Sequence, residues 1–136
     1  MEKNVKRAAH CGYTINYYLV WIPRYRKQVL VGGVAERLRA LFGEIAAQYG
    51  FELLASEVMP DHVHLFDSVP PKYSPAQAVR LFQGITLRRL KQEFPQIRRA
   101  YGREHAPLWA EGYYVGTAGH GSAAMIRRYI EENQKG

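Results

Sequence analysis

Two histidines separated by one residue have the type and spacing that best suit chemistry in this sequence. His62 and His64 flank Val63 in a stretch that reads as a strand. Side chains two residues apart on a strand point to the same face, so the imidazoles would converge while Val63 and Leu65 face the core. Neutral imidazole is a common ligand of divalent transition metals, which favours a metal site. The alternative is a pair of surface histidines on a half-exposed strand.

Tyr129 is the candidate nucleophile. A phenol with a pKa of about 10 attacks poorly at neutral pH unless a neighbouring cation favours the phenolate or polarises the electrophile. A bound metal would supply that cation. Arg127 and Arg128 add positive charge beside it, and Asn133 lies one turn further along the same helix face, where its amide oxygen could complete a coordination sphere. Apolar neighbours make a core aromatic on an amphipathic helix the alternative.

The elements that must position these residues follow from the hydrophobic pattern of 136 residues, which is enough for one domain and one core. Apolar spacing and a stop at Gly50 predict a helix from Val34. Ser74 to Gln77 has the pattern of a capping box and opens a second helix that ends near Phe94. Residues 96–107 read as a loop. Four stretches read as strands: Tyr13–Ile22, Phe51–Met59, His62–Val69 and Trp109–Thr117.

The order strand, helix, strand, strand, helix, strand predicts an α+β fold, the ferredoxin-like sandwich. We expect a four-stranded antiparallel sheet with helices on one face, and the strand of His62 and His64 in its middle. A C-terminal helix over residues 122–134 would carry Tyr129. Residues 116–121 contain three glycines and would form a joint before this helix, and residues 1–12 would form a loose N-terminal arm.

The composition indicates which class of partner the protein binds and in which compartment it works. A net charge of +7 favours attraction to a polyanion such as nucleic acid, although charge alone does not specify chemistry. Cys11 is the single cysteine and cannot form an internal disulfide, which suits a reducing compartment. The apolar run that ends at Pro23 is too short for a membrane span, so we expect a cytoplasmic protein.

Four motifs occur in a recognisable order and spacing: Trp21 to Arg26 (WIPRYR), Val58 to Leu65 (VMPDHVHL), Trp109 to Tyr114 (WAEGYY) and Tyr129 to Glu131 (YIE). Together they resemble the TnpA-type, IS200-like transposases of small insertion sequences. These are single-tyrosine members of the His-hydrophobe-His endonucleases. The resemblance extends from about Tyr13 to Gln134.

This resemblance implies that His62 and His64 bind Mg²⁺ or Mn²⁺ and that Tyr129 attacks a DNA phosphodiester. The products would be a 5′-phosphotyrosine and a free 3′-hydroxyl. The family's third ligand is usually a glutamine four residues after the tyrosine, where this sequence has Asn133. Gln134 has the longer reach but lies roughly 100° further round the helix, so both residues stay candidates and Asn133 is slightly favoured.

The resemblance also implies a homodimer in which each site joins the histidines of one subunit to the tyrosine helix of the other. The expected substrate is single-stranded DNA with a hairpin near each element end. Basic side chains after the first strand and on the second helix are candidates for holding the phosphate backbone: Arg24, Arg26, Lys27, Arg80, Arg88, Arg89 and Lys91. The alternatives are a binding module that does not cut, and a domesticated relative that processes repeated palindromes.

Overall fold

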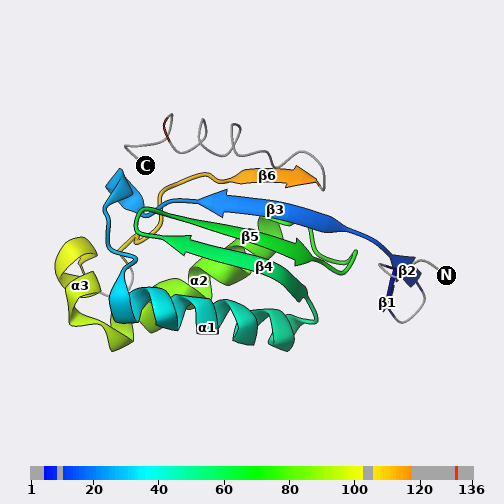
Figure 1. Cartoon of the computed structure of the whole chain (residues 1–136), viewed down its shortest axis with the longest axis horizontal. Coiled ribbons are helices and arrows are strands. Elements are labelled where there is room, and N and C mark those ends of the chain that lie inside the picture. The colour runs from blue at the N-terminus through cyan, green and yellow to red at the C-terminus, as the bar shows by residue number, and fades with distance from the viewer. Residues whose placement is uncertain (1–4, 9–10, 103–105, 118–130, 132–136) are drawn as a thin grey trace.

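The computed structural model describes residues 5–8, 11–102, 106–117 and 131. Its main part is a four-stranded antiparallel sheet with two long helices on one face (Figure 1). The predicted ferredoxin-like α+β sandwich is therefore confirmed. Of the expected helix over residues 122–134, all but residue 131 lies outside the described residues, and this includes Tyr129, Asn133 and Gln134. Among the described residues, no helix is both long and apolar enough to cross a bilayer.

The sheet has the strand order β4-β5-β3-β6, with β3 at Asn16–Trp21, β4 at Glu52–Met59, β5 at His62–Ser68 and β6 at Tyr114–Thr117. The strand that carries the histidines, β5, pairs with β4 on one side and with β3 on the other. It is thus central, as predicted. A tight turn at Pro60 and Asp61 joins β4 to β5, so these two strands form a hairpin.

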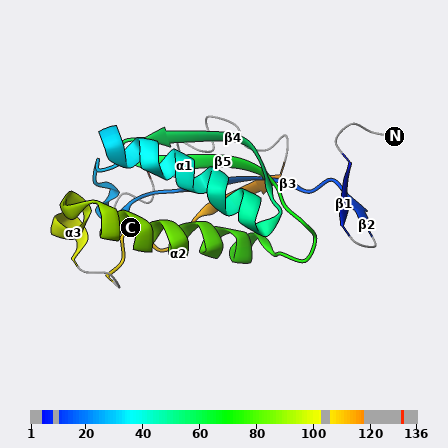
Figure 2. The ribbon, with the colours of Figure 1, turned by 90° about the horizontal axis from the view of Figure 1, so that it is seen from below.

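Helices α1 (Gly32–Tyr49) and α2 (Pro75–Glu93) lie on the same side of the sheet (Figure 2). Gly50 ends α1 in the left-handed conformation, with φ of 77°, which glycine adopts without steric cost. At the start of α2, the Ser74 hydroxyl accepts from the Gln77 backbone N–H, and the Gln77 side chain accepts from the Ser74 backbone N–H. The predicted capping box is therefore present.

The core fills the space between these helices and the sheet. Trp21 of β3 packs edge-to-face against Phe42 of α1 and against Trp109, and it also lies against Phe82 of α2. The indole N–H of Trp109 donates to the Thr86 hydroxyl over 3.1 Å, which satisfies a buried donor. The other face of the sheet carries a second, smaller cluster, in which Val20 and Ile22 are fully buried together with Ala110.

The first half of residues 96–107, predicted as a loop, belongs to helix α3 (Pro95–Tyr101). Pro95 occupies the first turn, where its missing N–H costs nothing, and Ile97 and Tyr101 are buried one turn apart on the same face. Two buried residues in seven gave too weak a periodic signal for sequence analysis. The contacts of α3 with the rest of the fold stabilise a helix that its polar composition does not suggest.

The N-terminal region also differs from the loose arm predicted for residues 1–12. Strands β1 (Lys6–Ala8) and β2 (Cys11–Tyr13) pair antiparallel, and this hairpin stands apart from the sheet (Figure 1). The stretch Tyr13–Ile22, predicted as one strand, is therefore divided between β2 and β3. The last strand is shorter than predicted, because Trp109 forms only an isolated bridge with Pro23 before β6 begins at Tyr114.

Candidate functional site

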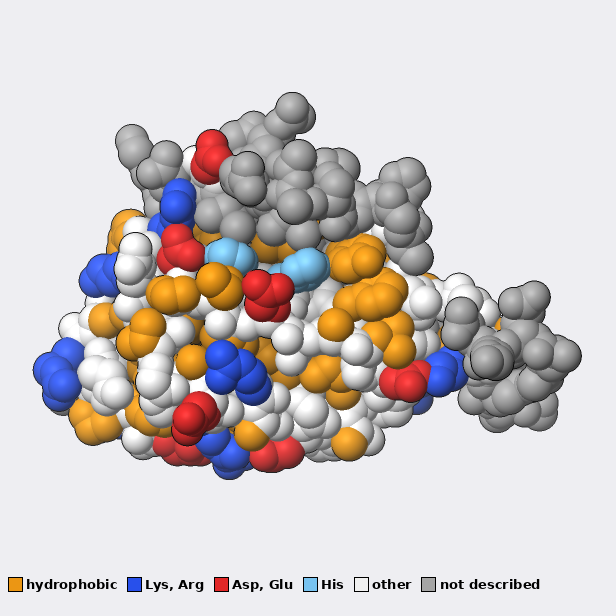
Figure 3. Space-filling model, in the orientation of Figure 1, with side chains coloured by type: hydrophobic (Ala, Val, Ile, Leu, Met, Phe, Trp, Pro, Cys, Tyr) orange, Lys and Arg blue, Asp and Glu red, His pale blue; other side chains and the backbone are white. Residues whose placement is uncertain are grey.

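His62 and His64 lie on the sheet face opposite the two long helices. Val63 and Leu65, which alternate with them along β5, are fully buried in the core between sheet and helices. The two histidine side chains are partly exposed and lie close together (Figure 3). The alternation predicted from the sequence is therefore confirmed, and the imidazoles share one face.

The imidazole of His62 is oriented by the residue before it. Its Nδ1 lies 3.0 Å from Oδ1 of Asp61, and Nε of Arg26 donates to Oδ2 of the same carboxylate over 2.9 Å. Partial burial opposes ionisation of Asp61, but the hydrogen bonds from Arg26 and His62 outweigh it and lower the pKa of Asp61. Because the ionised Asp61 carboxylate can only accept hydrogen bonds, a neutral His62 must carry its proton on Nδ1. This leaves the lone pair of Nε2 free to bind a cation.

His64 has a buried nitrogen that lacks a partner. Its Nε2 is buried and has no hydrogen-bond partner among the described residues. Burial lowers the pKa of His64, the charge of Glu57 opposes this shift, and His62 adds to it. A lowered pKa keeps the ring neutral near pH 7, which is the state that binds metals.

These two imidazoles fit a divalent cation, since one presents a free lone pair and the other a buried nitrogen in need of a partner. Among the described residues, no group of three or more His, Cys, Asp or Glu side chains is placed to hold a metal. The remaining ligands would have to come from elsewhere. The candidates Asn133 and Gln134, and the candidate nucleophile Tyr129, lie outside the part of the chain that the structure describes.

The predicted basic residues Arg24, Arg26 and Lys27 lie on a short 3-10 turn, η1 (Arg24–Arg26), and directly after it. Residues of helix α3 form hydrogen bonds with this turn. The Tyr101 hydroxyl donates to the Arg24 carbonyl over 2.9 Å, and the Lys27 ammonium donates to the Ala100 carbonyl and lies over the Tyr101 ring. Because Arg26 also binds Asp61, the basic turn is joined to the histidine pair.

The basic residues of α2 do not join this group. Helix α2 covers the sheet face opposite the histidines, so the exposed Arg80 and Arg88 lie on the other side of the sheet. Lys91, predicted to contact DNA, is 1% exposed, and its ammonium donates to the carbonyls of Tyr101 and Ala106. The prediction is wrong for Lys91, because its long apolar stem and paired ammonium are part of the interior that supports α3.

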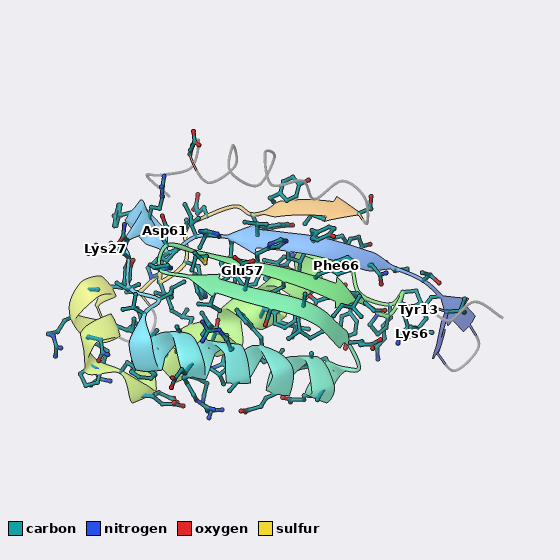
Figure 4. The ribbon with its side chains drawn as sticks, viewed as in Figure 1. Lys6, Tyr13, Lys27, Glu57, Asp61 and Phe66 are labelled. Carbon is teal, nitrogen blue, oxygen red and sulfur yellow. The ribbon has the colours of Figure 1, made fainter. Side chains whose placement is uncertain are left out.

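Sequence analysis missed several side chains around the histidines. Asp61 was treated only as a turn residue, although its position beside His62 was a usable signal. Glu57 and Phe66 were not singled out, yet both share a sheet face with the histidines (Figure 4). The same alternation that placed His62 and His64 also places Phe66 with them.

Residues 11–133 match the family described as "Transposase IS200 like". The ISDra2 transposase TnpA of Deinococcus radiodurans is 39% identical over 128 residues, which cover 93% of this chain and 89% of that protein. The transposase for insertion sequence element IS200 of Salmonella typhimurium is 26% identical over 134 residues, covering 96% of this chain and 87% of that protein.

Two solved structures are also similar. The crystal structure of a candidate transposase from Deinococcus radiodurans R1 superposes with a TM-score of 0.85 at 35% identity, covering 96% of this chain and 99% of that one. A REP-associated tyrosine transposase bound to a REP hairpin has a TM-score of 0.53 at 16% identity. The match covers 98% of this chain and 70% of that one, and it supports the fold alone. The chain belongs to the family of IS200-like transposases.

Proposed function

We propose that this transposase cuts and rejoins single-stranded DNA through a covalent 5′-phosphotyrosine on Tyr129, with a divalent metal held by His62 and His64. The observation that carries the proposal is the histidine pair itself. Asp61 orients one imidazole, and the other has a buried Nε2 without a partner among the described residues. The two features together distinguish this pair from histidines whose ring nitrogens all face water.

The chemistry balances without an external energy source. The Tyr129 oxygen forms a bond to phosphorus, the bond from phosphorus to the 3′ oxygen breaks, and the phenol proton passes to that oxygen. A free 3′-hydroxyl can later attack the phosphotyrosine, which restores a phosphodiester and frees the phenol. When bound, Mg²⁺ or Mn²⁺ polarises the scissile phosphate.

The residues of this chain bind the cation and the DNA and orient the ligand side chains. His62 and His64 hold the cation, with either Asn133 or Gln134 as a third ligand. Asp61 and Arg26 fix the His62 ring, so that little reorganisation is needed at the moment of reaction. The basic turn at Arg24 and Lys27, together with a net charge of +7, attracts the phosphate backbone to the side of the sheet where the histidines lie.

We further propose a hairpin-containing element end as the DNA and a homodimer as the working form. One solved protein of the same fold is bound to a REP hairpin, and we extend a DNA hairpin to this chain as the proposed kind of partner. In the dimer, the tyrosine of one copy would meet the histidines of the other. Mixing a Tyr129→Phe subunit with a His64→Ala subunit tests this, because only tyrosine placement across subunits restores one intact site per dimer.

A covalent adduct is the direct test of cutting. The protein is incubated with a single-stranded element end labelled on the side that would stay attached, plus Mn²⁺, and run on a denaturing gel. Wild type should give a slower protein band that carries the label, and Tyr129→Phe should give none. Tyr113→Phe is the matched control, since Tyr113 is an exposed tyrosine not assigned to the reaction. Retarded DNA without an adduct under Mg²⁺ or Mn²⁺ would instead favour the module that binds without cutting.

A further inference from the structure

The sheet face opposite the two long helices carries a pair of stacked aromatic rings beside the histidines. Tyr18 of β3 and Phe66 of β5 are register partners, and their ring centroids lie 4.3 Å apart with an interplanar angle of 18°. The Tyr18 ring also lies 5.4 Å from the His64 ring. Both aromatic side chains are partly exposed. Rings on the two central strands thus extend the histidine site along the sheet.

Next to these rings is a hollow of about 150 Å³, lined by Tyr18, Ala55, Ser56, Glu57, His64 and Phe66. Its shape follows from the strand register. Ala55 of β4 lies opposite Phe66, so a small side chain leaves room beside the ring. Glu57 lies opposite His64 in the strand register and lines the same hollow. We call this space the aromatic hollow.

The lining of the aromatic hollow suits a nucleobase better than a phosphate. Bases stack on aromatic side chains, and four-stranded sheets with aromatics on their open face bind single-stranded nucleic acid in this way. The Glu57 carboxylate would repel a phosphate, but it can accept a hydrogen bond from an amino group of a base. The phosphates would then follow the basic turn, and one base would enter the hollow.

We propose that the aromatic hollow binds one unpaired DNA base beside the histidine pair, and that Glu57 selects a base with an amino group, such as cytosine, over thymine. This inference rests on the proposed function, because it requires a single-stranded substrate. It adds a base-binding and selecting site formed by protein side chains. The ring of Phe66 supplies stacking, and Glu57 supplies the acceptor that thymine cannot use, since the corresponding edge of thymine carries an oxygen.

Binding without metal tests the stacking. Fluorescein-labelled 12-mers of deoxycytidine are titrated by fluorescence anisotropy in EDTA, so that no cutting occurs. Phe66→Leu should weaken binding about 5- to 150-fold, the range expected for loss of one stacked base, and Phe66→Tyr should restore it. Ala55→Leu should weaken binding as well, because it fills the hollow from an exposed strand position. Tyr49→Leu, which removes a half-buried ring on the helix side, is the matched control and should bind like wild type.

Base selection gives a second measurement. Wild type should prefer the cytidine 12-mer to a thymidine 12-mer, and Glu57→Gln should reduce this preference about 5-fold. Comparing ratios removes differences that belong to the oligonucleotides themselves. An unchanged ratio would overturn the role of Glu57, and unchanged affinity in both Phe66→Leu and Ala55→Leu would overturn the site.

The inference and the proposed function fail in different ways. If wild type forms the adduct on Tyr129 but Phe66→Leu and Ala55→Leu bind DNA normally, only the aromatic hollow is refuted. If wild type neither binds the 12-mers nor forms an adduct, the proposed function fails first. A lower melting temperature for Ala55→Leu with unchanged DNA affinity would indicate that the hollow receives part of the protein itself, and this also overturns the inference.

Discussion

Oδ1 of Asp61 lies 3.0 Å from Nδ1 of His62, while Oδ2 of the same carboxylate accepts a hydrogen bond from Arg26 over 2.9 Å. One side chain thus connects the basic turn to the candidate metal ligand. The arrangement sets the direction of the His62 lone pair, because a carboxylate on Nδ1 leaves Nε2 as the free nitrogen.

Asp61→Ala should weaken Mn²⁺ binding about 10- to 100-fold, the usual effect of losing the partner of a ligand histidine. Asp61→Asn should lose less Mn²⁺ affinity than Asp61→Ala, since the amide oxygen of Asn can still accept a hydrogen bond from Nδ1 of His62. Isothermal titration calorimetry measures the affinity, with Glu36→Ala on the exposed side of α1 as control. In the metal-free protein, the ¹⁵N shifts of His62 should report a proton on Nδ1 for wild type and a tautomer mixture for Asp61→Ala. Identical spectra would show that the carboxylate does not set the tautomer.

Arg26→Ala should weaken Mn²⁺ binding less than Asp61→Ala, because Arg26 acts on His62 only through the carboxylate. The two substitutions should be less than additive in the double variant, since removing Asp61 already removes the group that Arg26 orients. Calorimetry on the four proteins completes the cycle. Fully additive losses would mean that Arg26 and Asp61 act independently.

The fold was predictable where local signals were strong. Alternation at His62 to Leu65, the capping box at Ser74 and Gln77, and the stop at Gly50 all fixed elements correctly. Helix α3 was not predictable in this way, because only Ile97 and Tyr101 mark its buried face and its stability depends on packing. The β1-β2 hairpin likewise rests on a three-residue pairing that no periodicity reveals.

The candidate site was only partly accessible from sequence for a similar reason. Adjacent positions such as Asp61 and His62 can be read directly, but Tyr18 and Phe66 are 48 positions apart and meet only through strand register. Charge was the least reliable guide. Lys91 and Arg88 look equivalent in the sequence, yet one is buried beneath α3 and the other is exposed.

Asp67 should make stability fall as pH rises. Its carboxylate is fully buried, without a hydrogen-bond partner among the described residues, and burial raises its pKa to about 7. The folded pKa is above the unfolded value, so ionisation favours the unfolded chain. The protonated Asp67 contributes fully to the free energy of unfolding below about pH 4, and this contribution is lost as the pH rises through about 7. The loss is at most about 4 kcal/mol.

Asp67→Leu, which replaces the acid with an apolar side chain, should therefore raise the free energy of unfolding more at pH 8 than at pH 5. Urea denaturation at the two pH values measures the difference. The control is Glu111→Leu at an exposed position, which should show no such change between the two pH values. Equal effects of Asp67→Leu at pH 5 and pH 8 would contradict a raised pKa.

Arg24 and Lys91 should separate DNA binding from folding. Arg24 lies on the basic turn, so Arg24→Ala should weaken binding of a single-stranded 12-mer and reduce the slope of log affinity against log salt by about 0.7, the contribution of one phosphate contact. Lys91→Met should leave the slope unchanged but lower the free energy of unfolding, because the carbonyls of Tyr101 and Ala106 lose their buried donor. Arg88→Ala, exposed on the opposite side of the sheet, should change neither quantity. A salt slope that falls in Lys91→Met or Arg88→Ala would place the DNA path over α2 and not along the basic turn.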